Sequence, residues 1–98
     1  MQIYKSPQYN VAAQFKYEFS GDMITATLLM SDGVLSSDIF DFTDFPDGEL
    51  EVDTIESMIS IQPILSAKRI DGELFVEVLN YIDSEATEEE LYPEWTVV

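Results

Sequence analysis

The clearest structural signal in the chain is QFKYEFSGDMITATLL, residues 14–29, in which apolar and polar side chains alternate on both sides of one glycine. Alternation with a period of two is typical of a half-buried β-strand. A two-residue Gly21-Asp22 loop, with glycine supplying the positive φ of a type II′ turn, would fix the register of a hairpin. The opposed pairs on its apolar face are then Phe19 with Ile24, Tyr17 with Ala26 and Phe15 with Leu28. A slip of one residue would oppose apolar and polar side chains, so the pattern favours this register.

A second hairpin is predicted over residues 61–82, because Asp71-Gly72 is a strong signal for a type I′ turn. Its register gives a mostly apolar core face, on which Arg69, Ala67, Leu65, Pro63 and Ile61 lie opposite Leu74, Val76, Val78, Asn80 and Ile82, in that order. On the other face Ile70, Lys68, Ser66, Ile64 and Gln62 lie opposite Glu73, Phe75, Glu77, Leu79 and Tyr81, in that order. That face is too apolar to be bare to water, so another sheet layer, the C-terminal segment or a partner should cover part of it. Because proline has no N–H to donate, the strand with Pro63 should lie at an edge or begin near that residue.

The segment between the hairpins predicts a third strand and a less regular stretch. A loop at residues 31–33 should lead into a strand near residues 34–42. The core face of that strand would hold Val34, Ser36, Asp38, Phe40 and Phe42. Its two polar members favour an edge strand or a bulge. Residues 45–48 favour a tight turn. Residues 49–60 favour an extended segment and then one or two helical turns, with a capping-box pattern at residues 53–56.

The C-terminal residues 83–95 predict one short helical turn and a returning aromatic segment. Thr87 with Glu90 can form a capping box, and Pro93 would end the turn. We expect Trp95 to pack back on the sheet rather than to stand free.

These patterns predict one domain, residues 1–98, of the mainly β class. Antiparallel hairpins would form a small sandwich or a partly open barrel, with one or two short helical turns. A chain of 98 residues suits a single domain, and its hydrophobic content of 46% is enough for a core.

The charge of the chain argues against several kinds of partner. Twenty acidic residues face four basic ones, which gives a net charge of −16. Phosphate contacts need clustered Lys and Arg, so we expect no binding to nucleic acid or to an anionic membrane surface. No apolar run approaches the roughly 18 residues of a membrane span. Residues 1–7 lack the apolar region of a signal peptide, so we do not expect secretion by that route.

The residue inventory also argues against catalysis. The chain has no histidine and no cysteine, which removes the Ser-His-Asp and Cys-His arrangements and thiolate zinc sites. Ser66 and Lys68 could form a Ser-Lys pair, but Lys68 has acidic neighbours across the hairpin that explain it more simply. An EF-hand alignment on Gly48 places Thr54 where the bidentate glutamate belongs, so that motif fails. We therefore expect a protein that is not an enzyme and that uses no cofactor and no metal.

Several segments of the chain resemble small uncharacterised proteins encoded by bacteriophages and prophages of Gram-positive bacteria, some of them near tail genes. The matching segments are FDF at 40–42, FPDGE at 45–49, PILSA at 63–67, DGELFVEVLN at 71–80 and PEW at 93–95. They are turns and hydrophobic strands without catalytic signatures, and no functional residue carries over from the family. The resemblance implies a phage or prophage protein located in the bacterial host cytoplasm or in the virion.

Two functions are compatible with these features. The first is a non-enzymatic structural or accessory interaction module, plausible in a phage tail, which binds a protein partner or a second copy of itself. The residues expected to contact the partner are Phe75, Leu79, Tyr81, Leu91, Tyr92 and Trp95. The second is an acidic inhibitor that mimics the charge of nucleic acid and binds a basic host protein.

Overall fold

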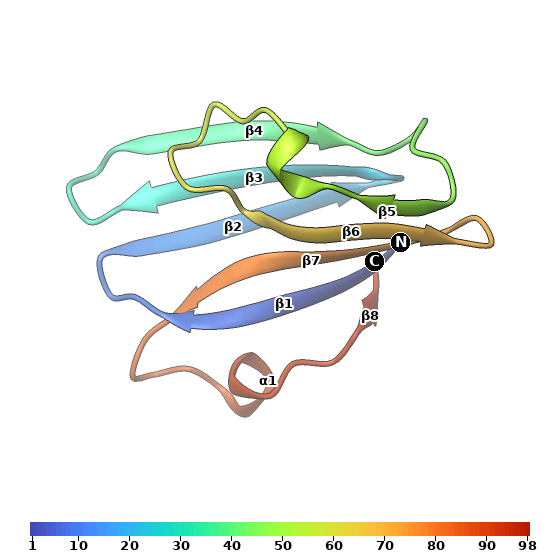
Figure 1. Cartoon of the computed structure of the whole chain (residues 1–98). Coiled ribbons are helices and arrows are strands. Elements are labelled where there is room, and N and C mark those ends of the chain that lie inside the picture. Colours follow the sequence, from blue (N-terminus) through green and yellow to red (C-terminus); the bar gives the residue numbers. More distant parts are fainter.

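The computed structural model describes residues 1–98 and consists mainly of strands (Figure 1). The strands are β1 (Gln2–Tyr9), β2 (Ala13–Ser20), β3 (Met23–Met30), β4 (Leu35–Asp41), β5 (Gly48–Leu50), β6 (Ile64–Ile70), β7 (Glu73–Ile82) and β8 (Thr96–Val97). A single 3-10 turn, η1 (Val52–Thr54), and one short helix, α1 (Glu88–Leu91), complete the elements. The strands form a five-stranded sheet in the order β5-β6-β7-β1-β8 and a three-stranded sheet in the order β2-β3-β4. The predicted mainly β, sandwich-like fold is confirmed, and the sheets do not close into a barrel.

The first predicted hairpin is formed by β2 and β3 in the predicted register. Phe19 lies opposite Ile24, Tyr17 opposite Ala26 and Phe15 opposite Leu28. Gly21 has a φ of 58°, the left-handed value that the first position of a type II′ turn requires. Most of these inward side chains are buried, so this hairpin supplies the core face of the smaller sheet.

The third strand, β4, is an edge strand, as its polar core-face positions predicted. Phe40 and Phe42 are buried, but Val34 is 54% exposed and precedes the strand, so its predicted core position is wrong. The reason is local: the Val34 N–H donates to the Asp32 carboxylate at 3.0 Å, which keeps Val34 in the turn.

Asp38 lies on the core side of β4, opposite the buried Ala26, because the following linker gives its carboxylate a partner. Its Oδ2 accepts a hydrogen bond from the Met58 N–H at 2.9 Å, and Figure 1 shows the segment 51–62 passing beside β4. This bond, with a second from the Ile39 N–H, holds the pKa of Asp38 below its usual value. The acid thus fastens the linker over the edge of the smaller sheet.

The linker itself is extended and then turns once, as predicted, although the turn is η1 and not the capping box predicted at residues 53–56. Ile55 returns to an extended backbone, which ends the helical turn before such a box can form. The hydrogen-bonded turn before β5 also lies earlier than predicted, because the Phe45 N–H bonds the Phe42 carbonyl at 3.0 Å.

The second hairpin, β6–β7, follows the predicted register only near its turn. Asp71 and Gly72 have φ values of 49° and 83°, the two positive angles of a type I′ turn. A bulge at Leu65 then shifts the pairing, so that Ile64 and not Leu65 faces Val78. Ile64 is 1% exposed and Leu65 is 37% exposed, so the predicted core position of Leu65 is wrong.

Beyond the bulge, Pro63 leaves one backbone acceptor of β7 without a strand partner. The Leu79 N–H donates to the Pro63 carbonyl at 2.8 Å, but Pro63 has no N–H to return the second bond of an antiparallel pair. The Tyr17 hydroxyl of β2 donates to the Leu79 carbonyl instead. This bond joins the two sheets, and burial raises the pKa of Tyr17 above its ordinary value of 10.0. As predicted, the strand β6 begins next to Pro63.

The sequence analysis did not anticipate β1, which pairs in parallel with β7 along all eight of its residues. This pairing covers the free side of β7 and makes β7 a central strand. The burial of its Ile3 at 2% exposure anchors β1 to the core.

One end of the sandwich is joined by the side chain of Arg69, which the predicted register placed on the core face. Its guanidinium donates to the carbonyls of Phe45 (2.6 Å), Gly72 (2.9 Å) and Phe42 (2.8 Å). It also forms the one salt bridge of the structure, with Asp22 at 3.0 Å. Four acceptors from three different turns or loops satisfy a cation that is only 12% exposed.

Truncation of Ile64 and Leu65 tests the bulge. We expect Ile64→Ala to lower the free energy of unfolding by about 2–4 kcal/mol, because it opens a cavity in the core. Leu65→Ala should cost under about 1 kcal/mol, because Leu65 is half exposed. Urea unfolding of both variants measures the difference. A larger loss for Leu65→Ala would restore the unbulged register.

Removal of the Tyr17 hydroxyl tests the bond to the Leu79 carbonyl. Tyr17→Phe should lower the free energy of unfolding by about 1–2 kcal/mol, because a part-buried carbonyl loses its donor. Tyr9→Phe is the matched control, since Tyr9 is 63% exposed and should change nothing measurable.

The raised pKa of Tyr17 also predicts a pH dependence. Above pH 10 the unfolded chain releases the Tyr17 proton while the folded chain keeps it, so stability falls as the pH rises. The decline attributable to this group approaches about 1.4 kcal/mol per pH unit. Urea unfolding between about pH 9 and 11 should show that Tyr17→Phe declines less steeply than the wild type. Equal slopes would contradict the assignment.

Candidate functional site

Three aromatic side chains meet on the larger sheet, on the side that carries Phe75, and we call them the aromatic patch: Tyr4, Phe75 and Trp95. The Trp95 ring lies 5.6 Å from Tyr4 and 5.6 Å from Phe75, edge-on to the latter. The Nζ of Lys68 lies 5.8 Å from the centre of the Phe75 ring, within range of a cation–π contact. Trp95 therefore packs back on the sheet, as expected, and the C-terminal segment covers part of the face that was too apolar to stay bare.

A helix cap and a short strand pairing position the C-terminal tail at the aromatic patch. The predicted capping box is present, since Thr87 accepts from the Glu90 N–H and the Glu90 side chain accepts from the Thr87 N–H. After α1 the chain returns as β8, which pairs antiparallel with the start of β1. The rings of this segment are incompletely covered: Trp95 is 44% exposed and Tyr92 is 78% exposed.

The six predicted contact residues divide between the surface and the core. Phe75, Leu91, Tyr92 and Trp95 are partly or largely exposed. Leu79 and Tyr81 are buried at 7% and 9% exposure, so their predicted place on an open face is wrong. The cause is β2, which lies against the end of β7 and puts Phe15 only 5.3 Å from the Tyr81 ring.

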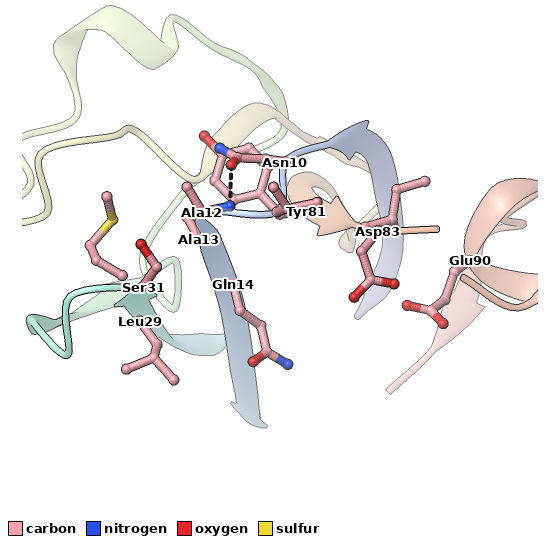
Figure 2. A pocket seen from close by; sticks show the side chains of 12 residues that line it. Asn10, Ala12, Ala13, Gln14, Leu29, Ser31, Tyr81, Asp83 and Glu90 are labelled. Atoms are coloured by element: carbon pink, nitrogen blue, oxygen red, sulfur yellow. Dashed lines mark hydrogen bonds between the residues drawn. The ribbon is translucent and has the colours of Figure 1, made fainter. Parts of the chain in front are cut away.

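A depression of about 300 Å³ lies where the β1–β2 turn meets the end of β7 (Figure 2). The carboxylates of Asp83 and Glu90 point toward one another there, and Asn10 accepts a bond from the Ala12 N–H at 2.9 Å. Asn10 thus shapes the turn, and Glu90 belongs to the capping box. No group of three or more acidic side chains in the structure is placed to hold a metal ion.

A larger groove of about 920 Å³ lies between β1, β2 and the tail, and we call it the β1–β2 groove. Apolar and aromatic side chains of Ile3, Phe15 and Phe19 line it from the two sheets. Its remaining lining includes Lys5, Glu88, Glu89, Glu90, Tyr92 and Glu94. It combines an apolar interior with an acidic border.

The surface features that sequence reasoning missed all involve β1. Tyr4 completes the aromatic patch, and Ile3 and Lys5 line the groove. The only buried side chain of β1 is Ile3, so its sequence carries almost no alternation signal. One buried residue among eight cannot show the alternation of apolar and polar side chains by which a strand is recognised in a sequence.

Comparison with known proteins finds no match to a family model, to a curated protein or to a solved structure. No helix in the structure has the length and apolar character needed to cross a membrane.

The packing of Trp95 can be tested by fluorescence, because Trp95 is the single tryptophan of the chain. Phe75→Ala removes the edge-on ring, so the emission should shift to the red and acrylamide quenching should increase. Tyr92→Ala is the control, since Tyr92 makes no ring contact with Trp95, and it should leave both readouts unchanged. Unchanged emission in Phe75→Ala would contradict the patch geometry.

Proposed function

We propose that this chain is a non-catalytic interaction module, which binds a partner protein or a second copy of itself through the aromatic patch and the neighbouring tail residues Leu91 and Tyr92. The supporting observation is that the tail brings Trp95 onto the sheet and still leaves 44% of it exposed. Trp and Tyr are enriched in the energetically dominant parts of protein interfaces, because they bury a large area at a low cost in entropy.

The resemblance to small bacteriophage and prophage proteins gives the proposal its biological setting. We place the module among the structural or accessory proteins of a phage, with the tail as the assembly in which it would act. In that setting the partner would be another protein of the particle or of its assembly.

The alternative, a mimic of nucleic-acid charge, has less support from the geometry. Such a mimic needs carboxylates that are free to face a basic groove. Several acids instead accept hydrogen bonds from backbone amides of their own turns, among them Asp32, Asp41 and Asp83. These acids stabilise turns, and this explains part of the acidity without a nucleic-acid competitor.

The proposal predicts concentration-dependent self-association or the specific capture of a phage protein. Sedimentation equilibrium at concentrations up to about 1 mM would detect weak self-association. Capture from lysates of phage-infected Gram-positive cells would detect a partner protein of the phage. Tyr92→Ser with Trp95→Ser should abolish whichever contact is found.

The matched control is Leu35→Ser with Ile39→Ser, which removes two side chains that are 65% and 56% exposed on β4. This variant should behave like the wild type. A strict monomer that captures no phage protein would refute the proposal, and so would a contact that only the β4 variant abolishes.

A further inference from the structure

The β1–β2 groove borders a strand edge that is open to pairing. β2 is an edge strand of the smaller sheet, and its backbone bonds to another strand go only to β3. The other row of N–H and C=O groups along β2 pairs with no strand of the chain, and such an unpaired row is the usual basis of β-augmentation.

The remaining edges of the two sheets are blunted, and β2 is not. β5 and β8, the edge strands of the larger sheet, have three and two residues. The part of β1 that β8 does not pair contains Pro7, which cannot donate to a neighbour. The linker passes beside β4 and is bonded to it through Asp38 (Figure 1). β2 has eight residues in unbroken register, without a proline or a bulge. Of the devices that usually protect an edge from a further strand, it carries only two charged side chains, Lys16 and Glu18.

The chemistry of the groove identifies what could pair there. Phe15 is buried and Phe19 is half-buried, so the accessible part of the Phe19 ring is the aromatic surface that the groove offers to apolar side chains. The side chains of Glu88, Glu89 and Glu94 line the groove and form no hydrogen bond or ion pair within the chain. One cation, Lys5, lines it against them, and the whole chain has a net charge of −16.

We propose that the β1–β2 groove binds an extended, cationic segment of a partner protein, which adds to β2 as a new edge strand. Alternate side chains of that segment would enter the apolar interior, and its Lys or Arg residues would face the glutamates of the tail. The groove shares Tyr92 with the interface proposed above, but the three rings of the aromatic patch do not line it, and it would bind a different kind of partner.

A second copy of this chain is the main competing occupant. Antiparallel pairing of two β2 strands about Tyr17 would oppose Lys16 of each copy to Glu18 of the other, which is favourable locally. The net charge of −16 on each copy opposes that approach over a longer range. The cationic segment is therefore the occupant that the charge favours.

The probe is a blocked nonapeptide of alternating Lys and Val, titrated into the whole chain by calorimetry and by ¹⁵N amide NMR. We expect amide shift changes centred on Ala13–Ser20. The affinity should fall as salt rises. A peptide with N-methylated backbone amides, and one with Glu in place of Lys, should not bind.

Two triple variants carry the same change of charge. Glu88→Gln with Glu89→Gln and Glu94→Gln should weaken peptide binding at least about fivefold, because three glutamates at the groove are neutralised. Glu90 is left in place for the capping box. The control, Glu49→Gln with Glu51→Gln and Glu73→Gln, changes acids outside the groove and should keep wild-type affinity.

Four outcomes would overturn the inference. They are no binding of the Lys-Val peptide, equal weakening by the two triple variants, shift changes centred on Trp95, and a dimer of the chain that occupies β2 and excludes the peptide. Phe75 does not line the groove, so Phe75→Ala should leave peptide affinity unchanged. This separates failure of the groove from failure of the interface proposed above.

Discussion

The guanidinium of Arg69 is the contact on which the arrangement of the two sheets most depends. It reaches from β6 of the larger sheet to Asp22 in the turn of the smaller sheet and to the carbonyls of Phe42 and Phe45 in the connection between the sheets. A cation that is 12% exposed would destabilise an apolar interior if it lacked acceptors. Here its acceptors come from segments far apart in sequence, so the charge is satisfied only when both sheets are in place. Arg69 thus stabilises the native arrangement of the sheets, and it destabilises other arrangements, in which its buried charge would lack acceptors.

The Tyr17 hydroxyl supplies a second connection, and it depends on an irregularity of the larger sheet. The bulge at Leu65 and the missing N–H of Pro63 end the β6–β7 ladder early. The Leu79 carbonyl is therefore left without a bond from β6, and the Tyr17 hydroxyl of the smaller sheet donates to it, because β2 packs against β7. The β1–β2 groove lies beside this contact, since Phe15 and Tyr81 both line it and their rings are 5.3 Å apart. The contact that joins the sheets and the groove therefore share residues of β2 and β7.

The parts of the fold that sequence predicted are those set by neighbouring residues. The turns at Gly21 and at Asp71-Gly72 are fixed by local backbone preferences, and both hairpins follow from them. The bulge escapes prediction because Ile64 and Leu65 are both apolar, so the pattern does not reveal which one turns inward. β1 escapes because it pairs in parallel with a strand more than seventy residues away. Arg69 was placed on the correct face, but its acceptors are backbone carbonyls, which carry no sequence signal.

The candidate surfaces show the same division between local and distant information. Trp95 could be assigned to the sheet because a lone indole after a proline needs a packing partner, and the structure confirms it. Leu79 and Tyr81 could not be assigned to the core, because β2 buries them. The sequence of their own hairpin does not indicate that β2 packs there. The acidic side chains also differ in whether they accept hydrogen bonds from the chain. Asp38 and Asp41 are held by amides of the chain itself, whereas Glu88, Glu89 and Glu94 have no such partner and line a groove with an apolar interior. A count of twenty acidic residues cannot separate these two groups, and the carboxylates of the second group have no hydrogen-bond partner in the chain that would compete with a ligand.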